Sequence, residues 1–155
     1  MDTPIITQRG LYFEEFEIGQ QIVSMGRTIT ESDIGLFAGL SGDFNQLHTD
    51  EEYAKNSLFG RRVAHGMLIL AIASGLAMRT GILEGTTLAF REISEWKFSK
   101  PVFIGDTIHV VMKVIEKKEM RRIGGGEISV QINVINQHDE MVMKGIWNVL
   151  VAAKG

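Results

Sequence analysis

The chain has 155 residues, 45% of them hydrophobic and 23% charged, with a formal net charge of −3. This length and composition are typical of one globular domain, which we expect to span residues 1–155. The small negative charge argues against nucleic acid or an anionic membrane surface as a partner. The absence of cysteine excludes disulfides and thiolate metal sites, and it suits a cytoplasmic protein.

The first third of the chain alternates irregular segments with short elements. Residues 1–10 are expected to form a flexible lead-in, and they lack the basic-then-apolar order of a secretory signal. Residues 20–29 are predicted to form a strand, weakened by Gly26. Thr30 is expected to cap a helix that runs to about Leu40, because Thr30 and the acid three residues later fit a capping box.

A polar loop then leads into an apolar helix. We expect a loop at 41–50, a short helix at 50–55 with acidic residues at its start, and a second loop at 57–64. A helix is predicted over 65–79, where the run from Gly66 to Met78 carries no charge. That run falls short of the roughly 20 residues that cross a bilayer. A helix that is apolar on every side must be wrapped by other elements.

The remainder of the chain is predicted to form an antiparallel meander. Apolar residues alternate with polar ones, as in strands with one buried face. The expected strands are 86–91, 94–99, 107–116, 128–135 and 141–152, with a hairpin turn at 124–126. A sheet curled around one apolar helix is an α+β hot-dog fold, and its open edges favour a homodimer or a higher oligomer. The predicted core comprises Ile69, Ile72, Ala73, Leu76, Trp96, Val110, Met112, Ile132 and Val149.

The 41–50 loop holds the residues best suited to chemistry. Asp43 offers a carboxylate base and His48 an imidazole that can accept or donate a proton, so the two can hold and deprotonate one water. Asn45 is able to fix the loop or the water. Gly66 begins the apolar helix, where a free N–H can stabilise a developing oxyanion. This combination suits the addition or removal of water next to a thioester carbonyl.

Simpler interpretations of the same residues stay open at this point. In these interpretations Asp43 is a turn cap, His48 an ordinary loop histidine and His65 a helix-entry residue. Asp43, His48 and His65 could converge in space, but no ligand-spaced pair lies on one helix face. We therefore expect no metal site and no cofactor.

A specific motif connects the sequence with a known family. The stretch Phe37–His48, followed by Ala54 and by His65-Gly66-Met67, resembles the hydratase-2 motif of the MaoC-like dehydratases. That family includes the (R)-specific enoyl-CoA hydratases, and the segment from Trp96 to Thr107 also resembles it. The motif places a small residue, Gly, Asp, Asn, an aliphatic residue and His in fixed register. Gln46 departs from the family, which usually has Pro there, so loop rigidity is in question.

The resemblance implies a hot-dog dimer that hydrates a trans-2-enoyl thioester to the (R)-3-hydroxyacyl thioester, or catalyses the reverse dehydration. It implies that Asp43 and His48 form a dyad that acts on a water, and that the Gly66 N–H binds the thioester oxygen. Which member of the dyad moves which proton cannot be read from the sequence. We expect Asn45, His65 and Met67 to contact substrate.

Alternatives remain for the carrier of the acyl group and for the class of reaction. The acyl chain should lie along the apolar helix and the inner sheet. The basic residues that could meet the carrier's phosphates outside are Arg61, Arg62, Lys97 and Lys100. CoA and an acyl carrier protein are the two candidate carriers of the thioester. A non-catalytic acyl-CoA-binding subunit and a thioesterase are the other candidates.

Overall fold

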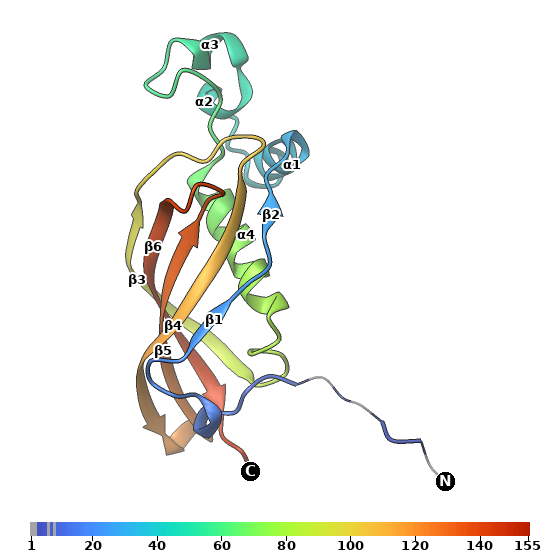
Figure 1. Ribbon diagram of the computed structural model, residues 1–155, viewed down its shortest axis with the longest axis vertical. Coiled ribbons are helices and arrows are strands. Elements are labelled where there is room, and N and C mark those ends of the chain that lie inside the picture. The colour runs from blue at the N-terminus through green and yellow to red at the C-terminus, as the bar shows by residue number, and fades with distance from the viewer. Residues whose placement is uncertain (1–2, 6, 8) are drawn as a thin grey trace.

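An antiparallel sheet of six strands curves around the apolar helix α4 (Gly66–Arg79), as Figure 1 shows. The computed structural model describes residues 3–5, 7 and 9–155. The strands are β1 (Gln21–Val23), β2 (Arg27–Thr28), β3 (Thr87–Phe98), β4 (Thr107–Met120), β5 (Gly125–Ile135) and β6 (Met141–Ala152). Their order is β1-β4-β5-β6-β3, with β2 also paired to β4. The predicted α+β hot-dog architecture is confirmed.

The helices other than α4 lie at one end of the sheet, where α2 and α3 extend beyond it (Figure 1). They are α1 (Glu31–Ser41), α2 (Gln46–Thr49) and α3 (Glu51–Lys55), and short 3-10 turns occur at Phe13–Glu15 and Arg121–Ile123. The predicted capping box is confirmed, since Thr30 accepts from the Asp33 N–H and Asp33 accepts from the Thr30 N–H. Among the described residues, no helix has the length and apolarity needed to cross a membrane.

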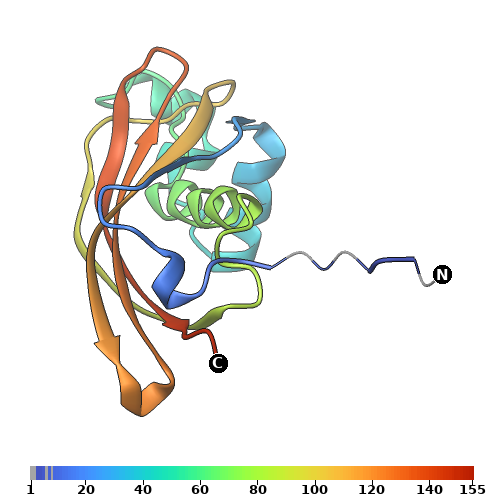
Figure 2. The same ribbon diagram turned by 60° about the horizontal axis from the view of Figure 1, so that its bottom comes forward.

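Helix α4 buries one face against the concave side of the sheet (Figure 2). Its buried residues are Leu68, Ile69, Ala73, Leu76 and Ala77. Alternate residues of β4, β5 and β6 meet them, because successive side chains of a strand point to opposite faces. Seven of the nine predicted core residues are buried, whereas Ile72 and Trp96 are only partly buried. The expectation that α4 is wrapped on every side is wrong, since Met67 and Met78 on its other face are exposed.

Two predicted strands differ from the structure at local irregularities. The strand expected at 20–29 is divided into β1 and β2, because Ser24 between them uses its Oγ to accept from the Val110 N–H at 2.8 Å. The strands expected at 86–91 and 94–99 are one continuous β3. Its pairing with β6 shifts register at a bulge where Glu95 has a positive φ of 52°.

The hairpin turn predicted at 124–126 is wrong in detail. Gly124 has a φ of 68° and ends the 3-10 turn, while Gly125 and Gly126 already belong to β5. A Cβ on Gly125 would lie 2.0 Å from the Val151 oxygen, and one on Gly126 would lie 2.3 Å from the Phe13 ring. The two strand glycines therefore permit close backbone approach rather than a turn.

Of the predicted lead-in at 1–10, residues 1, 2, 6 and 8 lie outside the described residues. Gly10 is buried, and its N–H donates to the Glu84 oxygen at 2.6 Å. The last residue of the predicted lead-in is thus part of the fold.

Two isoleucines on α4 test which face of the helix is the core. Ile69→Ala should reduce the free energy of unfolding by about 2–5 kcal/mol, because Ile69 is fully buried between α4 and the sheet. Ile72→Ala should cost only about 1 kcal/mol, because Ile72 is partly exposed. Denaturant unfolding of both variants measures the difference. Equal losses would mean that both faces of α4 are covered.

Candidate active site

The loop after α1 is held in place by its own polar side chains. Helix α1 ends at Gly42, which has a φ of 78°, a left-handed conformation that glycine favours. Asp43 Oδ1 accepts from the Asn45 N–H at 3.1 Å, and Asn45 Oδ1 caps α2 by accepting from the Leu47 N–H at 3.0 Å. Asp43 therefore does stabilise a turn, and this hydrogen bond uses only one of its two carboxylate oxygens. The side-chain oxygen of Asn45 is used within the loop, as the cap of α2.

Two histidines are fixed by hydrogen bonds to main-chain carbonyls. His48 lies on α2 with Nδ1 2.6 Å from the Val63 oxygen, and His65 precedes α4 with Nε2 2.9 Å from the Asp43 oxygen. A carbonyl oxygen only accepts, so we assign the hydrogen of each neutral ring to the bonded nitrogen. The lone pair of His48 is then on Nε2 and that of His65 on Nδ1. His48 Nε2 can therefore act as a proton acceptor.

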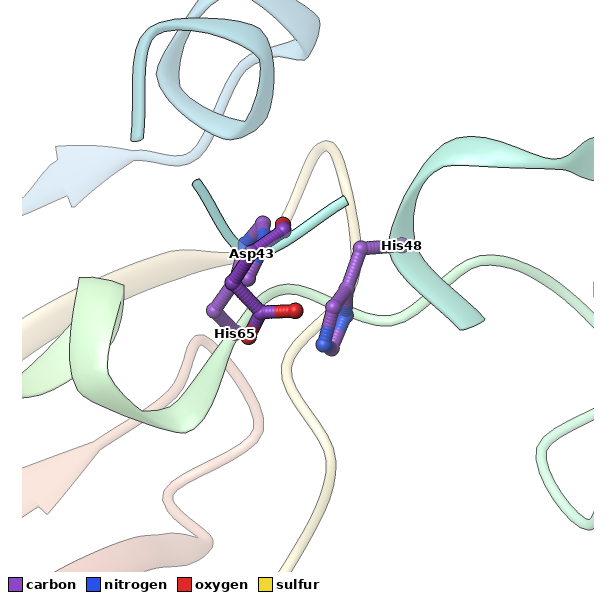
Figure 3. A group of neighbouring side chains, drawn as sticks. All are labelled: Asp43, His48 and His65. Atoms are coloured by element: carbon purple, nitrogen blue, oxygen red, sulfur yellow. The ribbon is translucent and has the colours of Figure 1, made fainter. Parts of the chain in front are cut away.

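Asp43, His48 and His65 come together as Figure 3 shows, each offering one polar atom within 4.8 Å of the others. The two imidazole rings stack with centroids 3.8 Å apart and an interplanar angle of 29°. Phe37 meets the other side of His65 edge-on at 4.9 Å. The lone pair of an imidazole nitrogen lies in the plane of its ring. Ligands of a tetrahedral metal ion must direct their lone pairs to one point, and two nearly parallel stacked rings do not do so. The arrangement suits a water better than a metal ion.

The three residues differ in their access to solvent. Asp43 is exposed and His48 half-buried, whereas His65 is only 2% exposed. Its Nδ1 has no hydrogen-bond partner in the part of the chain that the structure describes. His65 thus lies behind the loop that carries Asp43, where it contacts the main-chain oxygen of Asp43 and the ring of His48.

His48 and Gly66 line a largely apolar pocket of about 510 Å³ at the start of α4. The first N–H groups of a helix have no partner within the helix, so they are available to a bound group here. A Cβ on Gly66 would lie 2.7 Å from the Phe98 ring, which forms part of the pocket wall. Met67 also lines the pocket, together with Ile69 and apolar residues of the surrounding loops.

Of the four basic residues expected near phosphates, two are placed elsewhere. Arg62 donates to both oxygens of Glu31 at 2.7 Å and to Glu51 at 2.5 Å, which ties α1 to α3. These bonds lower the pKa of Glu31 and raise that of Arg62. Lys97 lies opposite Lys144 on β6 and lines a separate hollow.

Sequence reasoning missed three contributors to the site. The main-chain oxygen of Val63 orients His48, but a backbone acceptor has no residue-type signal. Phe37 packs edge-on against His65, and as the first residue of the motif stretch it carried no predicted role. Phe98 at the end of β3 lines the pocket, and its alternation in the strand indicated only which face it occupies.

The chain is similar to known proteins in sequence and in fold. Residues 14–135 match the family model of the MaoC-like domain, so the chain belongs to that family. The (R)-specific enoyl-CoA hydratase of Rhodospirillum rubrum is 42% identical over 107 residues, which are 66% of this chain and 69% of that protein. The chain thus belongs among the MaoC-like hydratases and dehydratases, which are hydro-lyases.

Solved structures extend the likeness to the whole fold. The structure of an Archaeoglobus protein named as a monoamine oxidase regulatory protein has a TM-score of 0.90 and 37% identity, over 97% of this chain and 100% of that one. The unliganded R-hydratase PhaJ1 from Pseudomonas aeruginosa has a TM-score of 0.77 and 30% identity, over 94% and 88% of the two chains.

Proposed function

We propose that the protein adds water to a trans-2-enoyl thioester to give the (R)-3-hydroxyacyl thioester, or catalyses the reverse dehydration. The observation that carries this proposal is the convergence of Asp43 and His48 within 4.8 Å beside the start of α4. An acid–base pair next to free helix N–H groups matches the needs of hydration at a conjugated thioester. The names of the relatives, (R)-specific enoyl-CoA hydratases among them, support the same reaction.

The thioester carbonyl is placed at the N-terminus of α4 in this proposal. The Gly66 N–H donates to the carbonyl oxygen, and the positive end of the helix dipole stabilises the charge that develops there. This withdraws electrons from the C2–C3 double bond and makes C3 electrophilic. A side chain at position 66 would meet Phe98, which is why glycine suits this position.

The water supplies both groups that are added. The Asp43 carboxylate holds one hydrogen of the water, and His48 Nε2, the nitrogen not bonded to Val63, accepts the other as the oxygen attacks C3. His48 then gives that proton to C2, so OH and H are added and the dyad returns to its starting state. Dehydration follows the same steps in reverse.

The acyl group is placed in the apolar end of the pocket. Ile69 from α4, Phe98 from β3 and Met143 from β6 line that end, so it lies between the helix and the inner face of the sheet. Burial of an alkyl chain there is favourable at roughly 0.8 kcal/mol per methylene.

Replacement of either dyad residue tests the mechanism. Asp43→Asn keeps shape but removes the base, and His48→Gln keeps size but removes the titratable ring. Each should lower hydration of an enoyl-CoA at least about a hundredfold, measured as loss of the conjugated thioester absorbance. The double variant should lose much less than the product of the two effects, because the pair acts as a unit.

The matched control is Glu116→Gln, which removes an exposed carboxylate of β4 and should keep full activity. Near wild-type activity of both single variants, with folding intact, would leave Asp43 and His48 as loop residues only. Release of free thiol without hydration would identify a thioesterase. A folded wild type inactive on every enoyl thioester would favour the acyl-binding subunit.

We also propose that the protein is a homodimer joined through β3. This strand ends the sheet, and its apolar residues Leu88, Phe90, Ile93 and Phe98 are 41–55% exposed. An edge strand with exposed apolar side chains is a template for pairing with another strand. A second copy that pairs antiparallel with β3 would satisfy both features.

Lysine at this edge should prevent dimerisation. Phe90→Lys should convert a dimer at micromolar concentration into a monomer in sedimentation velocity, because a charge on an edge strand opposes pairing. Ile115→Lys, a similar change at an exposed position of β4, should remain dimeric. A monomeric wild type, or a dimeric Phe90→Lys, would contradict the proposed interface.

A further inference from the structure

A groove of about 630 Å³ lies between α1 and α4, which are neighbours in the fold (Figures 1 and 2). Its walls are largely apolar: α1 contributes Leu36 and Leu40, and α4 contributes Leu68, Ile72 and Gly75. Among the described residues, none lines both this groove and the pocket that holds His48 and Gly66. The groove is therefore separate from the candidate active site.

The apolar walls of this groove are open to solvent. Leu36 and Leu40 are 74% and 87% exposed, and their spacing of four residues places them on one face of α1. Gly75 keeps the facing wall low, because a Cβ built on it would have no other atom within 4 Å. Contiguous exposed apolar surface of this kind commonly marks a binding groove.

Three charged residues also line the groove: Arg27, Asp33 and Arg79. Both oxygens of Asp33 are engaged, since Oδ1 accepts from Arg27 Nη2 at 2.7 Å and Oδ2 accepts from the Thr30 N–H at 2.8 Å. In the part of the chain covered by the structure, Arg27 Nη1 has no hydrogen-bond partner and Arg79 forms no ion pair. Two guanidinium groups thus accompany one engaged carboxylate, which leaves an excess of positive charge.

We propose that this groove binds the anion of a free fatty acid, with its carboxylate at Arg79 and its alkyl chain between α1 and α4. Guanidinium groups bind carboxylates through charge-assisted hydrogen bonds, frequently two at once. The apolar walls remove the alkyl chain from water, which is favourable for each methylene buried. A ligand with both features is complementary to both parts of the groove, whereas an uncharged chain would leave the arginine without a counter-ion.

Removal of the free charge tests the carboxylate contact. Calorimetric titration should show that Arg79→Gln binds decanoate about tenfold more weakly than the wild type, because a charge-assisted bond is lost. The same variant should bind decanol, the uncharged alcohol of equal length, as the wild type does. Arg121→Gln, an exposed arginine beyond the far end of β4, is the matched control and should keep the affinity for decanoate. Equal decanoate affinity of Arg79→Gln and the wild type would overturn the proposal.

Filling the groove tests the place of the alkyl chain. Gly75→Leu should abolish decanoate binding, because the new side chain occupies the open space beside Ile72. The fold should survive, since leucine favours a helix more than glycine does and its Cβ meets no neighbour. Gly35→Leu, at an equally open position of α1 that does not line the groove, is the matched control and should bind normally. Unchanged binding to a folded Gly75→Leu would contradict the proposal.

Two further measurements distinguish other occupants, and neither requires turnover of a thioester. Methyl NMR spectra should show decanoate shifting the signals of Leu36, Leu40 and Ile72. Shifts confined to Leu47 and Val63 would instead place the acid in the pocket beside Gly66 and overturn the groove site. A smaller assembly of Gly75→Leu than of the wild type in sedimentation velocity would also overturn it, because the groove would then join two copies of the chain.

Discussion

The hydrogen bond from His65 to the main-chain oxygen of Asp43 holds the site together. It joins residues 22 positions apart, one at the end of α1 and the other at the start of α4. Because His65 is buried, loss of this bond would leave a polar group without a partner in the interior, which is costly. The same ring supports His48 by stacking. A single side chain therefore sets the positions of the carboxylate, the imidazole and the helix N-terminus.

The rest of the fold serves to fix α4 against the sheet. The buried face of α4 packs on alternate residues of β4, β5 and β6, so the N-terminus of the helix has a defined place. The ion pairs of Arg62 with Glu31 and Glu51 hold α1 and α3 together on the other side of the loop. The loop that carries Asp43 thus lies between two anchored elements, although Asp43 itself is exposed.

The parts of the fold that follow a local rule were predictable from the sequence. The capping box at Thr30 and the alternation in β4 to β6 each reflect a fixed chemical or geometric period, and both are confirmed. Asp43 and His48 are five residues apart in a short loop that follows Gly42, and this spacing indicated that they lie close together. Their catalytic roles remain proposals.

The errors come from interactions that act across the chain. Helix α2 has four residues, too few to form by propensity alone, and it depends on the Asn45 cap and the bond from His48 to Val63. Trp96 follows the Glu95 bulge and is therefore placed against Gly145 at the sheet edge, where it is only partly buried. Neither the carbonyl acceptors nor the bulge has a residue-type signal.

The tautomers of the two histidines test the central claim most directly. Long-range ¹H–¹⁵N NMR correlations of the imidazole rings, recorded where both rings are neutral, distinguish a hydrogen on Nδ1 from one on Nε2. The two carbonyl bonds predict Nδ1–H for His48 and Nε2–H for His65. A hydrogen on Nε2 of His48 would contradict the account, because the nitrogen assigned to accept the proton of water would then be a donor.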